Sequence, residues 1–262
     1  DTLLPSGKPA IVDIDRPEGE RVVETARAHG HPVMTVGAKG EAIRLLSVKT
    51  GGKGQILTVD AGSGVVEIEL PLVGTFQVSN ALVAAGLAMA TGLKPDAALA
   101  ALETLVGAPG RLDRVGVSNR GATVFVDYAH KPDALEKAID ALRPFATGKL
   151  ICVFGCGGDR DPGKRPIMGQ ISVERADVTI VTDDNPRTEV PAEIRRQILV
   201  GAPGAIEIGD RAEAIREAVR MAGPGDVILV AGKGHEPGQI IGTTTFPFSD
   251  HEAVRTALAE DH

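Results

Sequence analysis

The sequence predicts an α/β protein whose C-terminal half is built on a mostly parallel sheet with helices on both faces. After about residue 110, short continuous apolar runs alternate with longer helical segments, which is the pattern of parallel strands buried on both faces. The hydrophobic fraction is 43% and the charged fraction is 24%, as in a globular chain with a substantial core. A length of 262 residues suits one large domain or two ordinary ones.

The N-terminal part begins with a predicted βαβ unit. Strands are expected at 10–15 and 32–37, and a helix over 17–30 lies between them, with a proline in its first turn and a glycine at its end. Residues 42–70 then hold three short apolar segments separated by glycines. This pattern indicates a meander or a hairpin.

Two helices and a connection complete this part. The alanine-rich helix predicted at 74–93 is apolar nearly all round, so we expect it to be buried. A second helix is predicted at 94–105, and the Gly- and Pro-rich segment 106–116 is predicted to be a connection. We therefore place a domain boundary near residue 110, which gives domains at 1–110 and 111–262.

The C-terminal half alternates strands with helices to the end of the chain. The expected strands lie at 123–130, 149–161, 177–187, 205–210 and 226–236. The expected helices lie at 131–145, 164–176, 191–201, 211–223 and 250–260, and a hairpin is expected at 239–250.

Four of these strands end in polar sequence that contains glycine or proline. The tails are DYAHKPD (127–133), FGCGGDRDPGKRP (154–166), TDDNPRTE (182–189) and AGKGHEPG (231–238). Ligands bind at the carboxyl ends of strands in open parallel sheets, and those ends share one edge. The sequence therefore predicts a binding site built from all four tails.

The tail at 182–189 combines carboxylates with a guanidinium. Arg187 can bind a carboxylate through two parallel hydrogen bonds, a geometry that lysine cannot copy. Asn185 can both donate and accept, and Pro186 keeps Asn185 extended. With Asp184 as an acceptor for an ammonium group, the predicted guest is a zwitterionic amino acid. A turn that caps the next helix is the alternative interpretation.

The other tails supply further candidates. The glycine turn at 155–166 matches neither GxGxxG nor GxxxxGK[ST], but its N–H groups suit an anion or a carboxylate. Lys233 suits a phosphate or a carboxylate, and Glu236 suits an ammonium group. Asp127 and His130 are predicted to pair, and to orient a ligand or act as acid and base. Each motif taken alone is also compatible with a capped or solvated turn.

The composition argues against several classes of protein. Aromatic residues make up 3% and the net charge is −7, whereas nucleic-acid binding favours aromatic platforms and positive charge. No apolar run approaches the ~18 residues of a membrane span, and no secretion signal is present, so a cytoplasmic location is expected. Cys152 and Cys156 are expected to be reduced thiols, because a metal site needs more ligands.

Six motifs occur in an order that resembles the Mur ligase family of peptidoglycan synthesis. They are FQVSNALVAA, GAPGRLDRV, VDYAHKPDALEKAI, CVFGCGGDRDPGKRPIMG, VTDDNPRTE and LVAGKGHE, and within the family they are most similar to the ligases that add meso-2,6-diaminopimelate. The resemblance implies a UDP-binding domain, a central ATPase and a Rossmann-like C-terminal domain. Residues 1–110 then correspond to the latter part of the ATPase, and residues 111–262 to the complete C-terminal domain.

The resemblance also implies the chemistry. ATP phosphorylates the D-glutamyl carboxylate of UDP-N-acetylmuramoyl-L-alanyl-D-glutamate, the amine of meso-diaminopimelate attacks the acyl phosphate, and an amide, ADP and phosphate form. Mg²⁺ neutralises charge during phosphoryl transfer. The implied cofactors are ATP and Mg²⁺, and the implied partners are these small molecules. No nucleic-acid or membrane partner is expected, and the protein is expected to be a monomer.

Carried over by motif, the resemblance assigns residues to two sites. For the nucleotide, it implies that Asn80 contacts the adenine and that Arg111, Asp127 and His130 lie at the ATP site. Asp127 and His130 are also implied to be catalytic once the domains close. The amino-acid pocket is expected to consist of Arg160, Asp184, Asn185, Pro186, Arg187, Gly232 and Glu236. Lys131 stands where a related ligase has threonine, and receives no role.

The chain lacks a GxxxxGK[ST] motif and starts without Met. The family's P-loop, carbamylated lysine, uridine-nucleotide site and main Mg²⁺ ligands are therefore expected upstream of Asp1, and the chain alone is expected to be inactive. Two alternatives stay open: a ligase of the same type that adds L-lysine, and a non-catalytic amino-acid-binding module. Arg187 favours diaminopimelate, because lysine lacks one of its carboxylates.

Overall fold

The chain divides into two compact units. A computed structural model describes residues 4–51 and 54–261, and the two units are Asp1–Val106 and Gly107–His262. The division lies four residues before the boundary expected at 110 (110 − 106 = 4).

The first unit contains one sheet of five strands in sequence order, β1-β2-β3-β4-β5. The strands are β1 Ala10–Asp13, β2 Val33–Gly37, β3 Ile43–Thr50, β4 Gln55–Asp60 and β5 Val65–Leu70. With helix α1 (Gly19–Ala28), the parallel pair β1 and β2 forms the predicted βαβ unit. Strands β3, β4 and β5 form the predicted antiparallel meander.

The helices of the first unit depart from prediction at two points. Helix α2 (Thr75–Ala90) buries one face, whereas Leu87 on it is 52% exposed, so the expectation of burial all round is wrong. Helix α3 stops at Pro95–Ala100 and continues as a 3₁₀ turn, η1, Ala101–Thr104, because the last turn of a helix often tightens.

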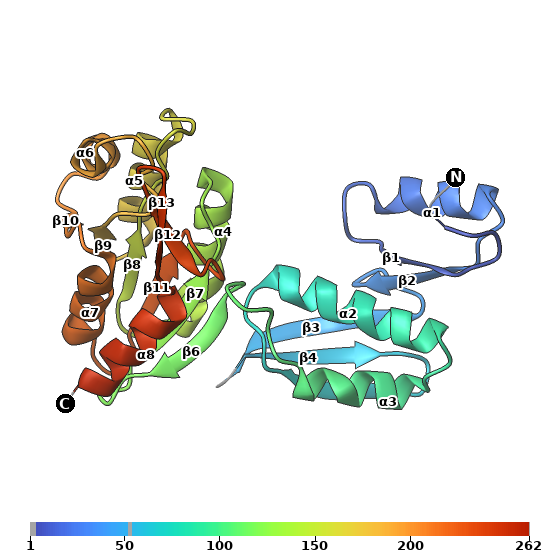
Figure 1. The fold of residues 1–262 in the computed structure, drawn as a ribbon. Helices are drawn as coiled ribbons and strands as arrows, with labels where there is room; N and C mark the ends of the chain where they lie inside the picture. Colours follow the sequence, from blue (N-terminus) through green and yellow to red (C-terminus); the bar gives the residue numbers. More distant parts are fainter. Residues whose placement is uncertain (1–3, 52–53, 262) are drawn as a thin grey trace. The chain divides into compact units, whose positions relative to one another are not determined.

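The second unit is the predicted mostly parallel sheet, with strand order β10-β9-β8-β11-β7-β6 (Figure 1). Its strands are β6 Asp113–Val117, β7 Thr123–Asp127, β8 Leu150–Phe154, β9 Val178–Val181, β10 Ile206–Glu207 and β11 Val227–Ala231. All neighbouring pairs are parallel except β6 with β7. Strand β6 lies in the segment expected to be a connection. Its short, bulged, half-exposed sequence carries little strand signal.

Helices cover both faces of this sheet, as predicted. Helices α4, α5 and α6 pack side by side, and α7 packs with α8. Their bounds are α4 Pro132–Leu142 (followed by η2, Arg143–Phe145), α5 Lys164–Arg175, α6 Pro191–Gly201, α7 Arg211–Met221 and α8 Asp250–Glu260. The predicted hairpin is also present, as β12 Gly238–Ile241 and β13 Thr244–Pro247.

The centre of the sheet is fully apolar, and one buried ion pair lies at its carboxyl edge. Every residue of β8 and β11 is buried. Arg211 and Asp250, at the starts of α7 and α8, are both fully buried and share two hydrogen bonds of 2.7 and 2.8 Å. Arg211 also donates to the carbonyl of Ala231 at 3.0 Å, so this pair fixes the end of β11, where the tail 231–238 begins.

Within the described residues, every helix is too short or too polar to cross a membrane.

The two cysteines give a first testable prediction. Cys152 in β8 and Cys156 after it are free and buried, and burial raises the pKa of each thiol to about 12. Because the thiolate is the reactive form, neither should react with iodoacetamide at pH 8 in the native protein. Intact-mass measurement is expected to show no adduct before unfolding and two after it, and an adduct on the native chain would contradict the prediction.

Candidate functional site

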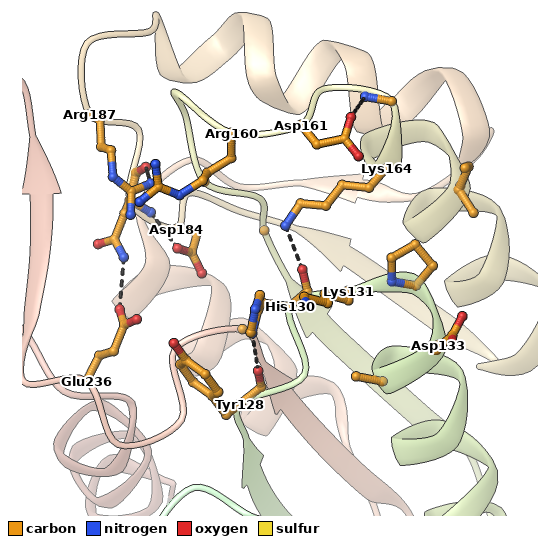
Figure 2. A pocket seen from close by; sticks show the side chains of 18 of the residues that line it. Tyr128, His130, Lys131, Asp133, Arg160, Asp161, Lys164, Asp184, Arg187 and Glu236 are labelled. Carbon is orange, nitrogen blue, oxygen red and sulfur yellow. Dashed lines mark hydrogen bonds between the residues drawn. The ribbon is translucent and has the colours of Figure 1, made fainter.

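A cavity of about 1050 Å³ opens among the tails of the second unit (Figure 2). Its walls come from the segments that follow β7, β8, β9 and β11. These are the four polar tails of the sequence, and the common direction of the parallel strands brings them to one edge.

The cavity gathers most of the predicted amino-acid pocket. Seven of the predicted residues line it: His130, Arg160, Asp184, Asn185, Arg187, Gly232 and Glu236. Four others do not belong to its lining: Asn80, Arg111, Asp127 and Pro186. Of these, Asn80 lies in the first unit, on an exposed position of α2, and donates to Gln77 Oε1 at 3.3 Å.

A buried lysine organises the floor of the cavity. Lys233 is fully buried, and its Nζ donates to Asn185 Oδ1 at 2.9 Å and to Glu236 Oε2 at 3.1 Å. Asn185 Nδ2 donates to the same Glu236 oxygen at 2.8 Å. The expectation that Lys233 binds a ligand phosphate or carboxylate is therefore wrong: the amine is used internally. The sequence missed this because a lysine between glycines normally indicates an exposed loop.

Glu236 keeps its negative charge in this network. Burial raises the pKa of its carboxyl, but hydrogen bonds from Asn185 and Lys233 and the charges of Lys233 and Arg187 outweigh burial and lower the pKa overall. Its second oxygen, Oε1, makes no hydrogen bond among the described residues. Glu236 can thus accept a hydrogen bond from a ligand ammonium group.

Asp184 lines the same cavity as Glu236 and explains why position 232 is glycine. Asp184 is buried, and its Oδ1 accepts from the N–H of Asn185 at 2.7 Å. Gly232 has φ +119°, and a Cβ there would lie 2.7 Å from Asp184 Oδ2. Any side chain at position 232 would therefore be strained and would displace this carboxylate.

Arg187 is held by the backbone of two other segments, the β12–β13 hairpin and the loop that contains Gly158. It has φ +51°, its N–H donates to the carbonyl of Ile240 at 3.0 Å, and its own carbonyl accepts from Gly242 at 2.6 Å. Its Nη1 donates to the carbonyl of Gly158 at 2.8 Å. Among the described residues its Nε and Nη2 make no hydrogen bond, so one edge of the guanidinium is available for a carboxylate.

Arg160 lies next to Arg187 (Figure 2). A Cβ built on Gly157 would meet Arg187 Nη1 at 2.8 Å and Arg160 Cγ at 3.9 Å, so both side chains pass the same glycine. Arg160 is exposed, and its Nη1 donates to the carbonyl of Asp159 at 2.9 Å. Two guanidinium groups therefore lie next to each other on one side of the cavity.

The predicted pairing of Asp127 with His130 is wrong. Asp127 is buried, and its carboxylate accepts from the N–H groups of Leu112 and Ala129, both at 2.7 Å. Burial raises the pKa of Asp127, and those two hydrogen bonds and the charge of Arg111 oppose the rise. His130 instead uses Nδ1 to contact the carbonyl of Tyr128 at 2.8 Å. Asp127 therefore shapes the turn by accepting hydrogen bonds from the backbone on both of its carboxylate oxygens.

Sequence reasoning also missed two residues near His130. Lys164 donates from Nζ to the carbonyl of His130 at 2.6 Å. Tyr128 places its ring 4.7 Å from that of His130, and the guanidinium of Arg111 lies 5.1 Å from the tyrosine ring centre. The signal for Tyr128 was present, since the only tyrosine of the chain stands at the carboxyl end of a strand.

Comparisons with known proteins agree on one family. Residues 2–88 match the model of the Mur ligase middle domain, and residues 110–234 match that of the Mur ligase glutamate ligase domain. A ligase from Mesorhizobium japonicum, named UDP-N-acetylmuramoyl-L-alanyl-D-glutamate–2,6-diaminopimelate ligase, is 58% identical over 99% of this chain and 54% of its own length. A ligase of the same name from Caulobacter vibrioides is 53% identical over 98% of this chain and 53% of its own length.

Solved structures give the same result. A structure of a UDP-N-acetylmuramoyl-L-alanyl-D-glutamate–2,6-diaminopimelate ligase aligns with a TM-score of 0.74 and 33% identity, over 97% of this chain and 54% of that one. MurF from Acinetobacter baumannii shares the fold at 18% identity, with a TM-score of 0.69 over 98% of this chain and 53% of that one. The chain spans about half the length of the curated relatives it matches.

A glycine at the closest approach of two loops gives a second prediction. A Cβ on Gly158 would lie 1.9 Å from the carbonyl oxygen of Pro186, whereas a Cβ on Gly223 would meet nothing within 4 Å. Gly158→Ala should lower the free energy of unfolding by about 1–3 kcal/mol, and Gly223→Ala, the matched control, should change it little. Urea denaturation measures both, and equal midpoints for the two variants would contradict the prediction.

The lowered pKa of Glu236 gives a third prediction. Because its pKa in the folded protein is below the ordinary 4.5, the unfolded chain binds more protons just below that pH. Glu236 thus stabilises the fold above about pH 4.5, and this contribution is lost as pH falls through the folded value. The free energy of unfolding of Glu236→Gln should fall less steeply with acid than that of the wild type. Parallel acid dependences in urea denaturation would contradict this.

Proposed function

The chain belongs to the Mur ligase family, and we propose that it is the amino-acid-binding part of a ligase that adds meso-2,6-diaminopimelate to UDP-N-acetylmuramoyl-L-alanyl-D-glutamate in peptidoglycan synthesis. One observation carries the proposal: the cavity combines the two guanidinium groups of Arg160 and Arg187 with the two carboxylates of Asp184 and Glu236. Ligases that carry this name and are 55–58% identical to the chain support it.

The charges suit one end of diaminopimelate. In this proposal the non-reacting carboxylate binds the free edge of Arg187 together with Arg160, and the neighbouring ammonium group binds Asp184 and Glu236 Oε1. L-lysine carries the ammonium group but no carboxylate at that end. A charged arginine–carboxylate contact in a buried site contributes roughly 2–4 kcal/mol, which is enough to separate the two amino acids.

His130 is proposed to act on the reacting end. Its Nδ1 contacts a carbonyl oxygen, which only accepts hydrogen bonds, so Nδ1 carries the proton in the neutral ring and Nε2 holds the lone pair. The amine of the amino acid attacks the carbonyl carbon of the acyl phosphate, the C–N bond forms, and the bond to the phosphate oxygen breaks. The proton lost by the amine passes to Nε2.

The assignment of residues to the ATP site rests on the motifs of the family. Mur ligases are ATP-dependent, and Asn80, Arg111 and Asp127 are proposed to contact ATP by their positions in the family motifs. Mg²⁺ belongs to the proposed reaction, where it neutralises phosphate charge. Among the described residues, no group of three or more His, Cys, Asp or Glu side chains is arranged to hold a metal ion, so no residue of this chain is assigned to it. We propose that the reaction takes place in the cytoplasm.

Calorimetric titration of the chain with meso-diaminopimelate and with L-lysine tests the proposal. The wild type should bind diaminopimelate more tightly than lysine, and Arg187→Ala should weaken diaminopimelate binding by roughly 2–4 kcal/mol without weakening lysine binding. Arg220→Ala is the matched control, because Arg220 on α7 pairs only locally with Glu217. Equal affinity of the wild type for the two amino acids, or an unchanged dissociation constant in Arg187→Ala, would refute the assignment.

A further inference from the structure

Two loops carry the guanidinium groups of the cavity, and we call them the clamp loops. They are residues 157–160, which end at Arg160, and residues 185–189, which contain Arg187. Their backbones touch: the N–H of Gly158 donates to the carbonyl of Asn185 at 2.9 Å. The spacing between the two arginines therefore depends on how these loops are joined.

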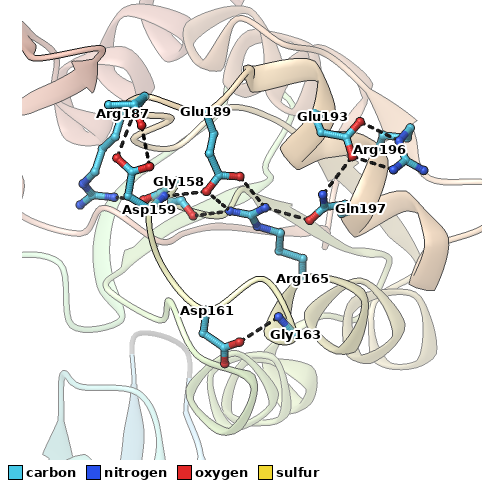
Figure 3. Close-up of polar contacts among 12 residues, drawn as sticks. Gly158, Asp159, Asp161, Gly163, Arg165, Arg187, Glu189, Glu193, Arg196 and Gln197 are labelled. Carbon is cyan, nitrogen blue, oxygen red and sulfur yellow. Dashed lines mark hydrogen bonds and ion pairs between the residues drawn. The ribbon is translucent and has the colours of Figure 1, made fainter.

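Glu189 joins the clamp loops to a buried arginine (Figure 3). Its Oε1 accepts from the N–H of Asp159 at 2.6 Å, and both of its oxygens accept from Arg165 at 2.8 Å. Arg165 is 1% exposed, and it also donates to the carbonyl of Gly157 at 3.1 Å. One carboxylate thus fixes the residue before Arg160 from the opposite loop.

Thr188 and Asp159 form a second link. The hydroxyl of Thr188 donates to Asp159 Oδ1 at 2.8 Å, and the N–H of Thr188 lies 3.3 Å from Asp159 Oδ2. Asp159 has φ +53° and Arg187 has φ +51°. Such left-handed conformations are unfavourable for residues other than glycine, and they persist only where neighbouring contacts impose them.

These contacts lie outside the cavity. Among the described residues that line it, none is Asp159, Arg165, Thr188 or Glu189. The side chain of Arg165 is also too deeply buried to reach a ligand. The four residues form a support behind the arginines and do not form part of the binding surface.

We infer that Glu189, supported by Arg165 and by the Thr188–Asp159 contact, is a positioning residue that sets the separation of Arg160 and Arg187. It would thereby set the selectivity for an amino acid with a second carboxylate. The inference rests on the proposed function, because it concerns the same cavity. It extends the specificity determinants beyond the residues that touch the ligand.

The test uses isosteric variants of the 262-residue chain titrated with meso-diaminopimelate and L-lysine. Glu189→Gln removes the charge that binds Arg165 and should weaken diaminopimelate binding roughly 10-fold or more. Thr188→Val removes only one hydroxyl contact and should weaken it about 5-fold. In both variants lysine binding should stay as in the wild type, so the ratio of the two affinities should fall.

Two controls separate positioning from folding. Thr188→Ser keeps the hydroxyl and should restore wild-type affinity, and Glu217→Gln removes a carboxylate that pairs with Arg220 on α7 and should change neither affinity. Thr188 is exposed, so its variants are decisive even if Glu189→Gln unfolds.

The outcomes distinguish the inference from the function it rests on. The inference would be overturned, with the proposed function intact, if the wild type binds diaminopimelate and both Thr188→Val and folded Glu189→Gln bind it with the same affinity. Weakened binding of both amino acids in equal measure would also overturn it, since a general loosening of the site has no selectivity. A wild type that does not bind diaminopimelate would overturn both.

Discussion

The shared direction of five parallel strands is the constraint on which the site depends. Because β7, β8, β9, β10 and β11 all run the same way, their carboxyl ends meet at one edge, and segments far apart in the chain become neighbours. The apolar centre of β8 and β11 fixes that edge. None of the described residues that line the cavity lies within a strand. They supply a rigid frame from which four short tails extend by a few residues each.

Close backbone approach is the second requirement, and glycine meets it. A Cβ added at Gly155 would lie 2.2 Å from the carbonyl oxygen of Thr182, and a Cβ added at Gly158 would lie 1.9 Å from the carbonyl oxygen of Pro186. The tails after β8 and β9 therefore pack backbone against backbone. The glycines of the turn at 155–166 therefore allow close packing against the loop after β9, which is a different role from that of glycines in a phosphate-binding motif.

Periodicity in the sequence predicted the elements of the fold, because it reports burial directly. The parallel sheet, the meander and the final hairpin follow from apolar runs and turn residues. The sequence did not predict strand β6, because an edge strand with a bulge needs no continuous apolar run. The burial of α2 was overestimated for a related reason, since composition does not say which side of an apolar helix finds a partner.

The site was predictable at the level of the tails and less so at the level of contacts. Residue type and strand position were enough to bring Asp184, Arg187 and Glu236 together. Lys233 was misassigned and Glu189 was not singled out, because a side chain's partner depends on tertiary geometry that spacing does not encode. The same holds for Asp127, whose carboxylate caps backbone N–H groups and does not reach His130.

Two guanidinium groups and two carboxylates in one cavity would neutralise one another if the loops were free to move. The structure prevents this by giving each charge another partner. Arg187 donates to the carbonyl of Gly158, and Arg160 donates to that of Asp159. Glu236 is occupied on one oxygen by Asn185 and Lys233. Neutral carbonyls orient the arginines without cancelling their charge, so a zwitterion can bind without first breaking an internal ion pair. Preorganisation of this kind lowers the free-energy cost of binding.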